Sequence, residues 1–153
     1  MTVMAIERGK IREFATATGA GRPAYLDDPK APVPPTFLAT VVFWSPIGVA
    51  VRLPEVLRAC AEAGVAADLG SLLSLEQEYV YHGPPPRAGE TLRTAERLTD
   101  VRAKWTRDGR AMVVVRFTVD FHDERGGLRA ECNYTSAYVQ RDRARGTARE
   151  TLP

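Results

Sequence analysis

The amino-acid sequence predicts an α+β domain in which an antiparallel sheet packs against a helix. In the second half of the chain, alternating, β-branched or aromatic runs are separated by turn residues, which is typical of sequential strands. Asp108-Gly109 and the segment from Glu124 to Gly127 are hairpin signals that join neighbouring runs in antiparallel fashion. The predicted strands cover residues 74–82, 91–106, 111–122 and 128–139.

The first 44 residues are predicted to hold a helix, a loop and one further strand. Apolar residues at mostly helical spacing predict an amphipathic helix within the segment from Met4 to Thr18. Five prolines between Pro23 and Pro35 predict a loop without regular structure. The run from Thr36 to Trp44 (TFLATVVFW) is β-branched and aromatic, and it predicts a buried strand.

A second amphipathic helix is predicted from Leu53 to Gly64, ahead of the four strands. Pro54 suits its first turn and Gly64 suits its end, where a left-handed residue commonly stops a helix. Residues 65–73 are small and apolar, and we expect a turn there.

The length and charge of the chain favour one folded domain with no electrostatic affinity for nucleic acid. A chain of 153 residues, 44% of them hydrophobic, buries enough surface for one core. We expect this domain to cover residues 1–140 and the polar residues 141–153 to form a disordered tail. The formal net charge is only +2, which gives no electrostatic case for binding nucleic acid.

No residue pattern indicates a membrane segment, a metal or another cofactor. The first ten residues lack the basic and apolar regions of a leader, and no apolar run approaches the roughly 18 residues of a spanning helix. We therefore expect a cytoplasmic protein that does not bind membranes. Cys60 and Cys132 form no CxxC pair, so two buried reduced thiols are expected.

Several short motifs together resemble the MaoC-like dehydratase N-terminal domain, which has the hot-dog fold. They are the PPTF sequence at residues 34–37, the segment EQEYVYHGP at 76–84 and the segment RAGETL at 87–92, preceded by Pro23-Ala24-Tyr25. The resemblance spans residues 4–140 and extends to the non-catalytic subunits of heterodimeric (3R)-hydroxyacyl-ACP dehydratases. It implies a curved antiparallel sheet of about five strands wrapped on one central helix, with an additional N-terminal helix. Ser74 stands where the family often carries a His.

The catalytic pair of the resembled superfamily is missing from this sequence. Hydration of an enoyl thioester needs a general acid and base, and catalytic members supply an Asp and a His in a Gly-Asp-x-Asn-Pro-x-His pattern. The corresponding stretch here runs from Gly19 to Tyr25, so Ala20 replaces the Asp, Arg22 the Asn and Tyr25 the His. The resemblance therefore implies a loop that retains its Gly and Pro but has lost its proton-handling groups.

Other residues offer only indirect substitutes for that pair. Asp27 and Asp28 are loop carboxylates close in sequence to Tyr25, although aspartates of this kind commonly form turns. His82 ends a predicted strand, where a hydrogen bond to a loop is favoured over a catalytic role. His122 is expected to be exposed beside a turn. No catalytic residue is therefore expected, and Asp27, Asp28 and His82 are the fallback candidates.

The resemblance implies a binding role, with three functions left open. The first is a non-catalytic subunit that binds an acyl thioester of coenzyme A or acyl carrier protein beside a catalytic MaoC-type partner. The second is a stand-alone acyl-binding homodimer. The third is a dehydratase or thioesterase with rewired catalytic residues. Fatty acid, polyketide and sterol side-chain metabolism all fit. Candidates for the wall of an acyl tunnel, or alternatively for ordinary core packing, are Pro35, Thr36, Phe37, Phe43 and Trp44.

Overall fold

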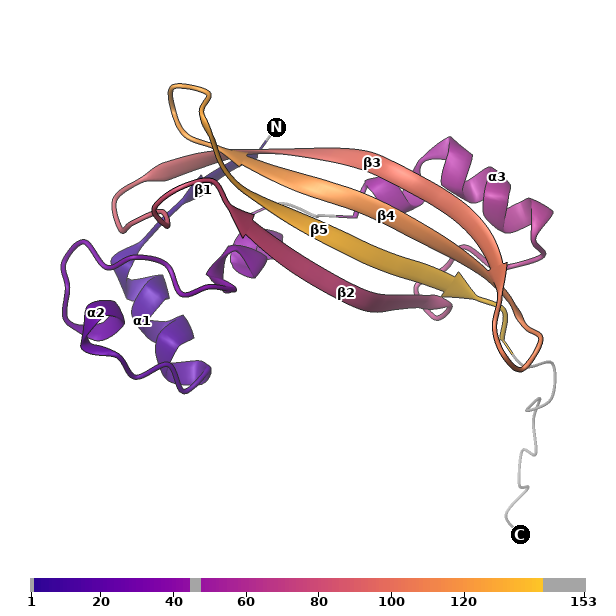
Figure 1. Cartoon of the computed structure of the whole chain (residues 1–153), viewed down its shortest axis with the longest axis horizontal. Coiled ribbons are helices and arrows are strands. Elements are labelled where there is room, and N and C mark those ends of the chain that lie inside the picture. The colour runs from indigo at the N-terminus through magenta and orange to yellow at the C-terminus, as the bar shows by residue number, and fades with distance from the viewer. Residues whose placement is uncertain (1, 45–47, 142–153) are drawn as a thin grey trace, which may run out of the picture.

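Five strands form a single antiparallel sheet in the order β1-β3-β4-β5-β2 (Figure 1). The computed structural model describes residues 2–44 and 48–141. Irregular register in β2, β3 and β4 interrupts the pairing at three points, and bulges of this kind bend and twist a sheet. The strands are β1 (Thr2–Ala5), β2 (Leu72–Tyr81), β3 (Thr91–Trp105), β4 (Ala111–His122) and β5 (Leu128–Val139).

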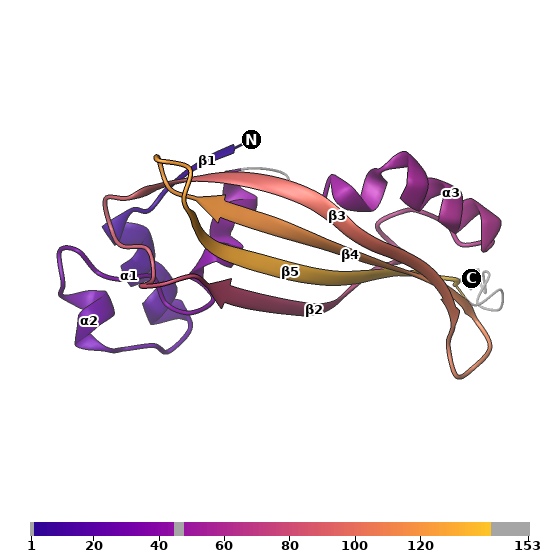
Figure 2. The same cartoon turned by 45° about the horizontal axis from the view of Figure 1, so that its top comes forward.

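The helices gather at two ends of the sheet. Figures 1 and 2 show α1 and α2 beside one end and α3 at the other, with the 3-10 turns η1 and η2 between them in the chain. Their bounds are α1 (Arg8–Ala17), α2 (Pro23–Leu26), η1 (Phe37–Phe43), η2 (Ala50–Arg52) and α3 (Pro54–Glu62). Among the described residues, no helix combines the length and apolar character needed to cross a bilayer.

The core lies on one face of the sheet because alternate residues of β4 and β5 are apolar. Val113, Val115 and Phe121 of β4 are buried in the same cluster as residues of η1 and α3. Their cross-strand partners on β5 include Tyr138, Ser136 and Ala130. We call this the inner face; the residues between them form the outer face, as strand geometry requires.

Two polar side chains of the inner face hold η2 against the sheet. The half-buried Glu96 of β3 accepts the backbone N–H of Ala50 at 2.6 Å and that of Gly48 at 3.1 Å. The buried Tyr138 hydroxyl donates to the Val51 carbonyl at 3.0 Å. These bonds pair backbone groups that η2 itself leaves without a helical partner, so they fix the path of the chain between η1 and α3.

The buried strand predicted from Thr36 to Trp44 is wrong, because the segment forms the 3-10 helix η1. Its buried residues are Phe37, Leu38 and Val41. That spacing of one and then three residues belongs to a helical face rather than to a strand, whose buried residues alternate. A short apolar run carries no periodicity strong enough to separate the two structures.

The N-terminal predictions need two corrections. Thr2–Ala5 forms β1 and pairs with Thr91–Thr94 of β3, so the predicted helix beginning near Met4 starts only at Arg8. Tertiary pairing with the edge of β3 decides the structure of these four residues. The proline-rich segment also contains one regular turn, α2, which begins at Pro23 because proline is tolerated at the first helical position.

In the second half of the chain, the strands agree closely with those predicted from the sequence. β4 and β5 have the predicted bounds, and Gly109 and Gly126 adopt positive φ in the turns that flank β4. The helix predicted from Leu53 is confirmed as α3, with Gly64 at φ +66° after its end.

Instead of one central helix, the segment opposite the sheet is divided into η1, η2 and α3. β2 begins within the predicted turn, and the predicted tail lies outside the described residues except for Arg141.

We expect Glu96→Ala to lower the free energy of unfolding by about 1.5–3 kcal/mol, since hydrogen bonds to a charged acceptor are lost. Urea unfolding followed by circular dichroism measures this value. Glu124→Ala is the matched control, because Glu124 is exposed in the turn between β4 and β5. Equal stability of the two variants would contradict an anchoring role for Glu96.

Candidate functional site

The loop before α2 is held in place by backbone bonds to the end of α1. The Ala20 N–H donates to the Ala15 carbonyl at 2.8 Å, and Gly19 has a φ of +70°, which favours glycine. Ala20 presents only a methyl group, and Arg22 is exposed. Tyr25 packs against the edge of the core cluster. The loop is therefore ordered, but its side chains at these positions include no carboxylate or imidazole.

Tyr81 connects the end of β2 to the proline-rich segment. Its hydroxyl donates to the Pro35 carbonyl at 2.9 Å. Burial, and after it the neighbouring Cys132 and Tyr25, together raise the pKa of Tyr81 from 10.0 to about 12. A phenol with that pKa keeps its proton at neutral pH, so Tyr81 can donate a hydrogen bond but cannot act there as a general base.

Asp28 stabilises its own loop. Its Oδ1 accepts the Lys30 N–H at 2.8 Å, and its Oδ2 lies 3.6 Å from Nη1 of Arg87. The Arg8 guanidinium donates to the carbonyls of Leu26, Asp27 and Asp28 over 3.3–3.4 Å. These contacts are those of a turn fixed by local hydrogen bonds. The Asp27 side chain is exposed.

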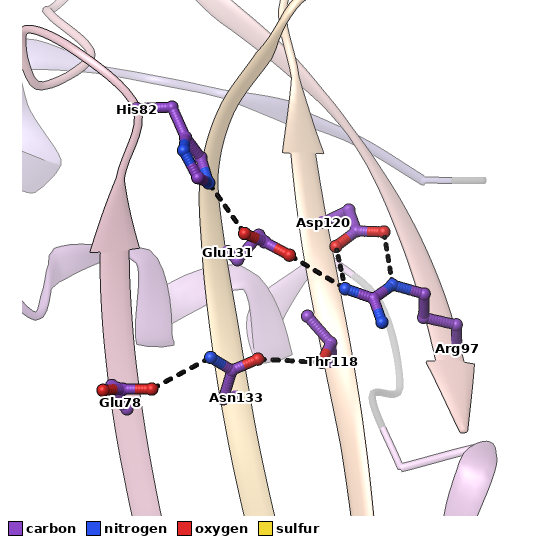
Figure 3. A network of polar contacts seen from close by, with 7 residues as sticks. All are labelled: Glu78, His82, Arg97, Thr118, Asp120, Glu131 and Asn133. Atoms are coloured by element: carbon purple, nitrogen blue, oxygen red, sulfur yellow. Dashed lines mark hydrogen bonds and ion pairs between the residues drawn. The ribbon is translucent and has the colours of Figure 1, made fainter. Parts of the chain in front are cut away.

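His82 lies on the outer face, in a network of charged side chains (Figure 3). Its Nε2 is 2.7 Å from Glu131, which also accepts a bond from Arg97 at 2.8 Å. Arg97 donates two further bonds to Asp120, at 3.0 and 3.3 Å. Because His82 follows Tyr81 directly at the strand end, the two side chains point to opposite faces. The imidazole is thus directed away from Tyr25 and Tyr81.

An apolar cleft lies between α1 and η1. It has a volume of about 420 Å³ and is lined by Phe14, Ala17, Thr40, Phe43 and Trp44, with Lys10 and Glu13 also in its lining. Lys10 and Glu13 form an ion pair at 3.0 Å. Phe43 is 82% exposed.

The five residues predicted as a tunnel wall fall in different environments. Phe43 and Trp44 line the cleft. Phe37 is fully buried and packs edge to face on Phe14, with ring centroids 5.5 Å apart. Pro35 and Thr36 are exposed in the loop before η1. Their assignment to an acyl-binding wall stays a prediction, to which the cleft adds Phe14 and Thr40.

No sequence pattern singled out Thr40 as a candidate for the site. Its hydroxyl is buried and has no hydrogen-bond partner among the described residues. A hydroxyl in that state retains the capacity for one more bond.

The inner face also carries a cluster of tyrosines around Cys132. The ring of Tyr134 stacks on Phe117 at 4.8 Å, and Tyr79 lies close to Cys132. Burial raises the pKa of the Cys132 thiol, so the thiolate needed for nucleophilic attack is disfavoured. Among the described residues no group of three or more His, Cys, Asp or Glu is placed to hold a metal ion.

The curved sheet and its helical segment define a protein of the hot-dog class, and two crystal structures from Mycobacterium tuberculosis have the same fold. The ChsH1-ChsH2 complex aligns at a TM-score of 0.65 with 20% identity, over 90% of this chain and 84% of that chain. The C-terminally truncated HadBC (3R-hydroxyacyl-ACP dehydratase) complex aligns at 0.61 with 20% identity, over 88% and 89%.

Comparison of amino-acid sequences shows the family of this chain. Residues 2–126 match the model of the FAS1-like dehydratase domain region. A UPF0336 protein of Streptomyces griseus is 30% identical in an alignment 131 residues long, which covers 80% of this chain and 77% of that protein. The chain belongs to the FAS1-like dehydratase family, and the predicted resemblance to MaoC-like hot-dog dehydratases is confirmed.

We expect the stability deficit of Tyr81→Phe to shrink at high pH. At pH 8 the variant loses the bond to Pro35, at a cost of about 0.5–1.5 kcal/mol. Since the folded-state pKa of Tyr81 is raised from 10.0 to about 12, its stabilising contribution is full below the lower value and is lost as pH rises through the upper one. Urea unfolding at pH 8 and pH 11 tests this, and a deficit that grows with pH would contradict it.

Proposed function

We propose that this chain is the non-catalytic, substrate-binding subunit of a (3R)-specific enoyl-thioester hydratase or dehydratase. The observation that carries the proposal is the ordered loop from Gly19 to Tyr25, which offers a methyl group, an exposed guanidinium and a phenol where catalytic relatives need an acid-base pair. In keeping with the resemblance, the proposal assigns the missing Asp and His to a separate MaoC-type chain. In this proposal the present chain contributes binding surface.

The chemistry divides between the two chains in a simple way. Water adds to the β-carbon of the enoyl thioester while a proton is delivered to the α-carbon, and the partner's acid-base pair performs both transfers. This chain binds and orients the acyl group against apolar side chains and keeps bulk water away from it. The cleft beside η1 supports that role, because its volume of about 420 Å³ falls within the range of small-molecule sites.

The need for a partner is supported by the free edge of the sheet. β2 lies at the end of the strand order and pairs with β5 alone among the described strands. Leu73 and Leu75 in the first half of β2 are 49% and 51% exposed, and Leu69 in the preceding turn is 74% exposed. A long edge strand with exposed apolar residues is a site for pairing with another chain. The similar HadBC and ChsH1-ChsH2 structures are themselves complexes.

We expect hydration of short and long enoyl-CoA substrates only when this chain is mixed with a MaoC-type protein that carries the full Gly-Asp-x-Asn-Pro-x-His motif. Loss of enone absorbance measures the reaction for each chain alone and for the mixture. Turnover by this chain alone would refute the proposal. Rewired catalysis would then be tested by replacing Tyr25, Asp27, Asp28 and His82, since loss of a catalytic group lowers the rate by about 10²-fold or more.

We expect Phe43→Ala to raise the KM of the mixture about tenfold for long acyl chains and little for short ones, because burial of about two methylene groups is worth about 1.4 kcal/mol or slightly more. Steady-state kinetics with two chain lengths measures this split. Trp105→Ala is the matched control, since Trp105 is another exposed aromatic residue, at the far end of β3. An equal change in KM for both chain lengths would contradict the assignment of the cleft to the acyl-binding site.

A further inference from the structure

We infer that the cleft between α1 and η1 selects acyl chains that carry a second oxygen, as a keto or hydroxyl group, and that Thr40 recognises this oxygen by a hydrogen bond. The inference deepens the proposed function and rests on it for the acyl thioester itself. Two observations carry it: the apolar cleft, and a buried hydroxyl without a partner in the lining of that cleft. Thr40 would thus determine specificity without touching the reacting atoms.

The walls of the cleft are mostly hydrocarbon. Phe14 and Ala17 of α1 contribute to one side, and Phe43 of η1 contributes to the other. The charged lining residues Lys10 and Glu13 are paired with each other at 3.0 Å, and their side chains are 51% and 69% exposed. These two charges are therefore satisfied by each other and by solvent, and a ligand inside the cleft meets mainly apolar groups.

The Thr40 hydroxyl is the exception in this lining. It is buried and has no hydrogen-bond partner among the described residues. A helical threonine can donate to the carbonyl three or four residues earlier, and Thr16 and Thr18 both do so at 2.8 Å, in α1 and directly after it. Thr40 makes no such local bond. Its hydroxyl therefore keeps an unused capacity for bonding, at a cost in stability.

This hydroxyl can turn toward a ligand without breaking a bond. Oγ1 and the methyl group of Thr40 share Cβ, and rotation about χ1 moves them among staggered positions. Helical threonines use two of these rotamers. Because Oγ1 has no partner to lose, rotation toward the cleft sacrifices no interaction. A ligand oxygen that accepts the bond removes the penalty of a buried, unpaired hydroxyl.

An acyl oxygen suits this position better than an internal water does. A buried water is typically held by about two to four polar groups, and apolar cavities stay dry. A single hydroxyl in a mostly apolar lining does not meet that requirement. A keto or hydroxyl group differs from water because its chain fills the apolar space while its oxygen makes the one bond on offer.

The recognised oxygen lies beyond the thioester. In the proposed function the thioester and its β-carbon are held at the acid-base pair of the partner chain, so the cleft receives the far part of the acyl group. A plain hydrocarbon tail leaves the Thr40 hydroxyl unpaired, whereas a tail with a second oxygen pairs it. A site that hydrogen-bonds a substrate group discriminates against the analogue that lacks this group.

The test measures binding to the full chain through the fluorescence of Trp44, which lines the cleft. Trp105 is the other tryptophan and is 74% exposed, so Trp105→Phe leaves Trp44 as the sole reporter. In this background, decanoyl-N-acetylcysteamine is compared with keto analogues whose carbonyl is moved along the far half of the chain. At least one analogue should bind about fivefold to tenfold more tightly than the plain thioester, the factor expected from one hydrogen bond.

Substitution of Thr40 separates its hydroxyl from its shape. Thr40→Val should abolish the preference for the keto analogue and leave the affinity for the plain thioester unchanged, whereas Thr40→Ser should retain the preference. Urea unfolding of the free Thr40→Val protein should show a midpoint no lower than that of the wild type, because no bond is lost. Thr118→Val is the matched control: the buried Thr118 hydroxyl donates to Asn133 at 2.8 Å, and its loss should lower the midpoint.

The inference would be overturned by a keto preference that survives Thr40→Val or by equal binding of the plain and keto thioesters. A lowered midpoint for Thr40→Val, or unchanged Trp44 fluorescence with every thioester, would also overturn it. The hydration assay keeps the proposed function separate. Activity only in the mixture, without any keto preference, refutes the Thr40 inference alone. Turnover by the isolated chain refutes the proposed function, while the binding comparison still decides the role of Thr40.

Discussion

The burial of one face of β4 and β5 beneath η1, η2 and α3 is the constraint on which the structure depends. Alternation along a strand sends each successive side chain to the opposite face. Tyr81 is therefore turned toward the core and the Pro35 carbonyl, whereas His82 is turned toward Glu131 on the outside. The same constraint separates a closed inner face, where burial suppresses ionisation of phenols and a thiol, from an outer face of paired charges.

Strong, repeated patterns made the sheet predictable. β4 and β5 have the predicted bounds because alternation over twelve residues and a glycine in each flanking turn agree. The segment from Thr36 to Trp44 was predictable as buried but not as helical, since a mostly apolar run of nine residues fits either structure. β1 was not predictable, because its four residues become a strand only by pairing with β3, far away in sequence.

The candidate site was predicted unevenly, for a physical reason. Loss of the acid-base residues is readable from residue identity alone at Ala20, Arg22 and Tyr25. Which aromatic residues stay accessible depends on the packing of α1 against η1, which leaves Phe43 exposed but buries Phe37. Glu96 was missed because a carboxylate on a polar strand looks solvated until its backbone partners at Gly48 and Ala50 are known.

The two free cysteines provide built-in reporters of local opening. Cys60 in α3 and Cys132 in β5 are 1% and 0% exposed. Burial raises the pKa of both thiols. An alkylating reagent reacts with a thiolate in solvent, so neither cysteine reacts until its own element opens. The ratio of the two labelling rates would therefore compare the opening of the helical segment with that of the sheet, without any added probe.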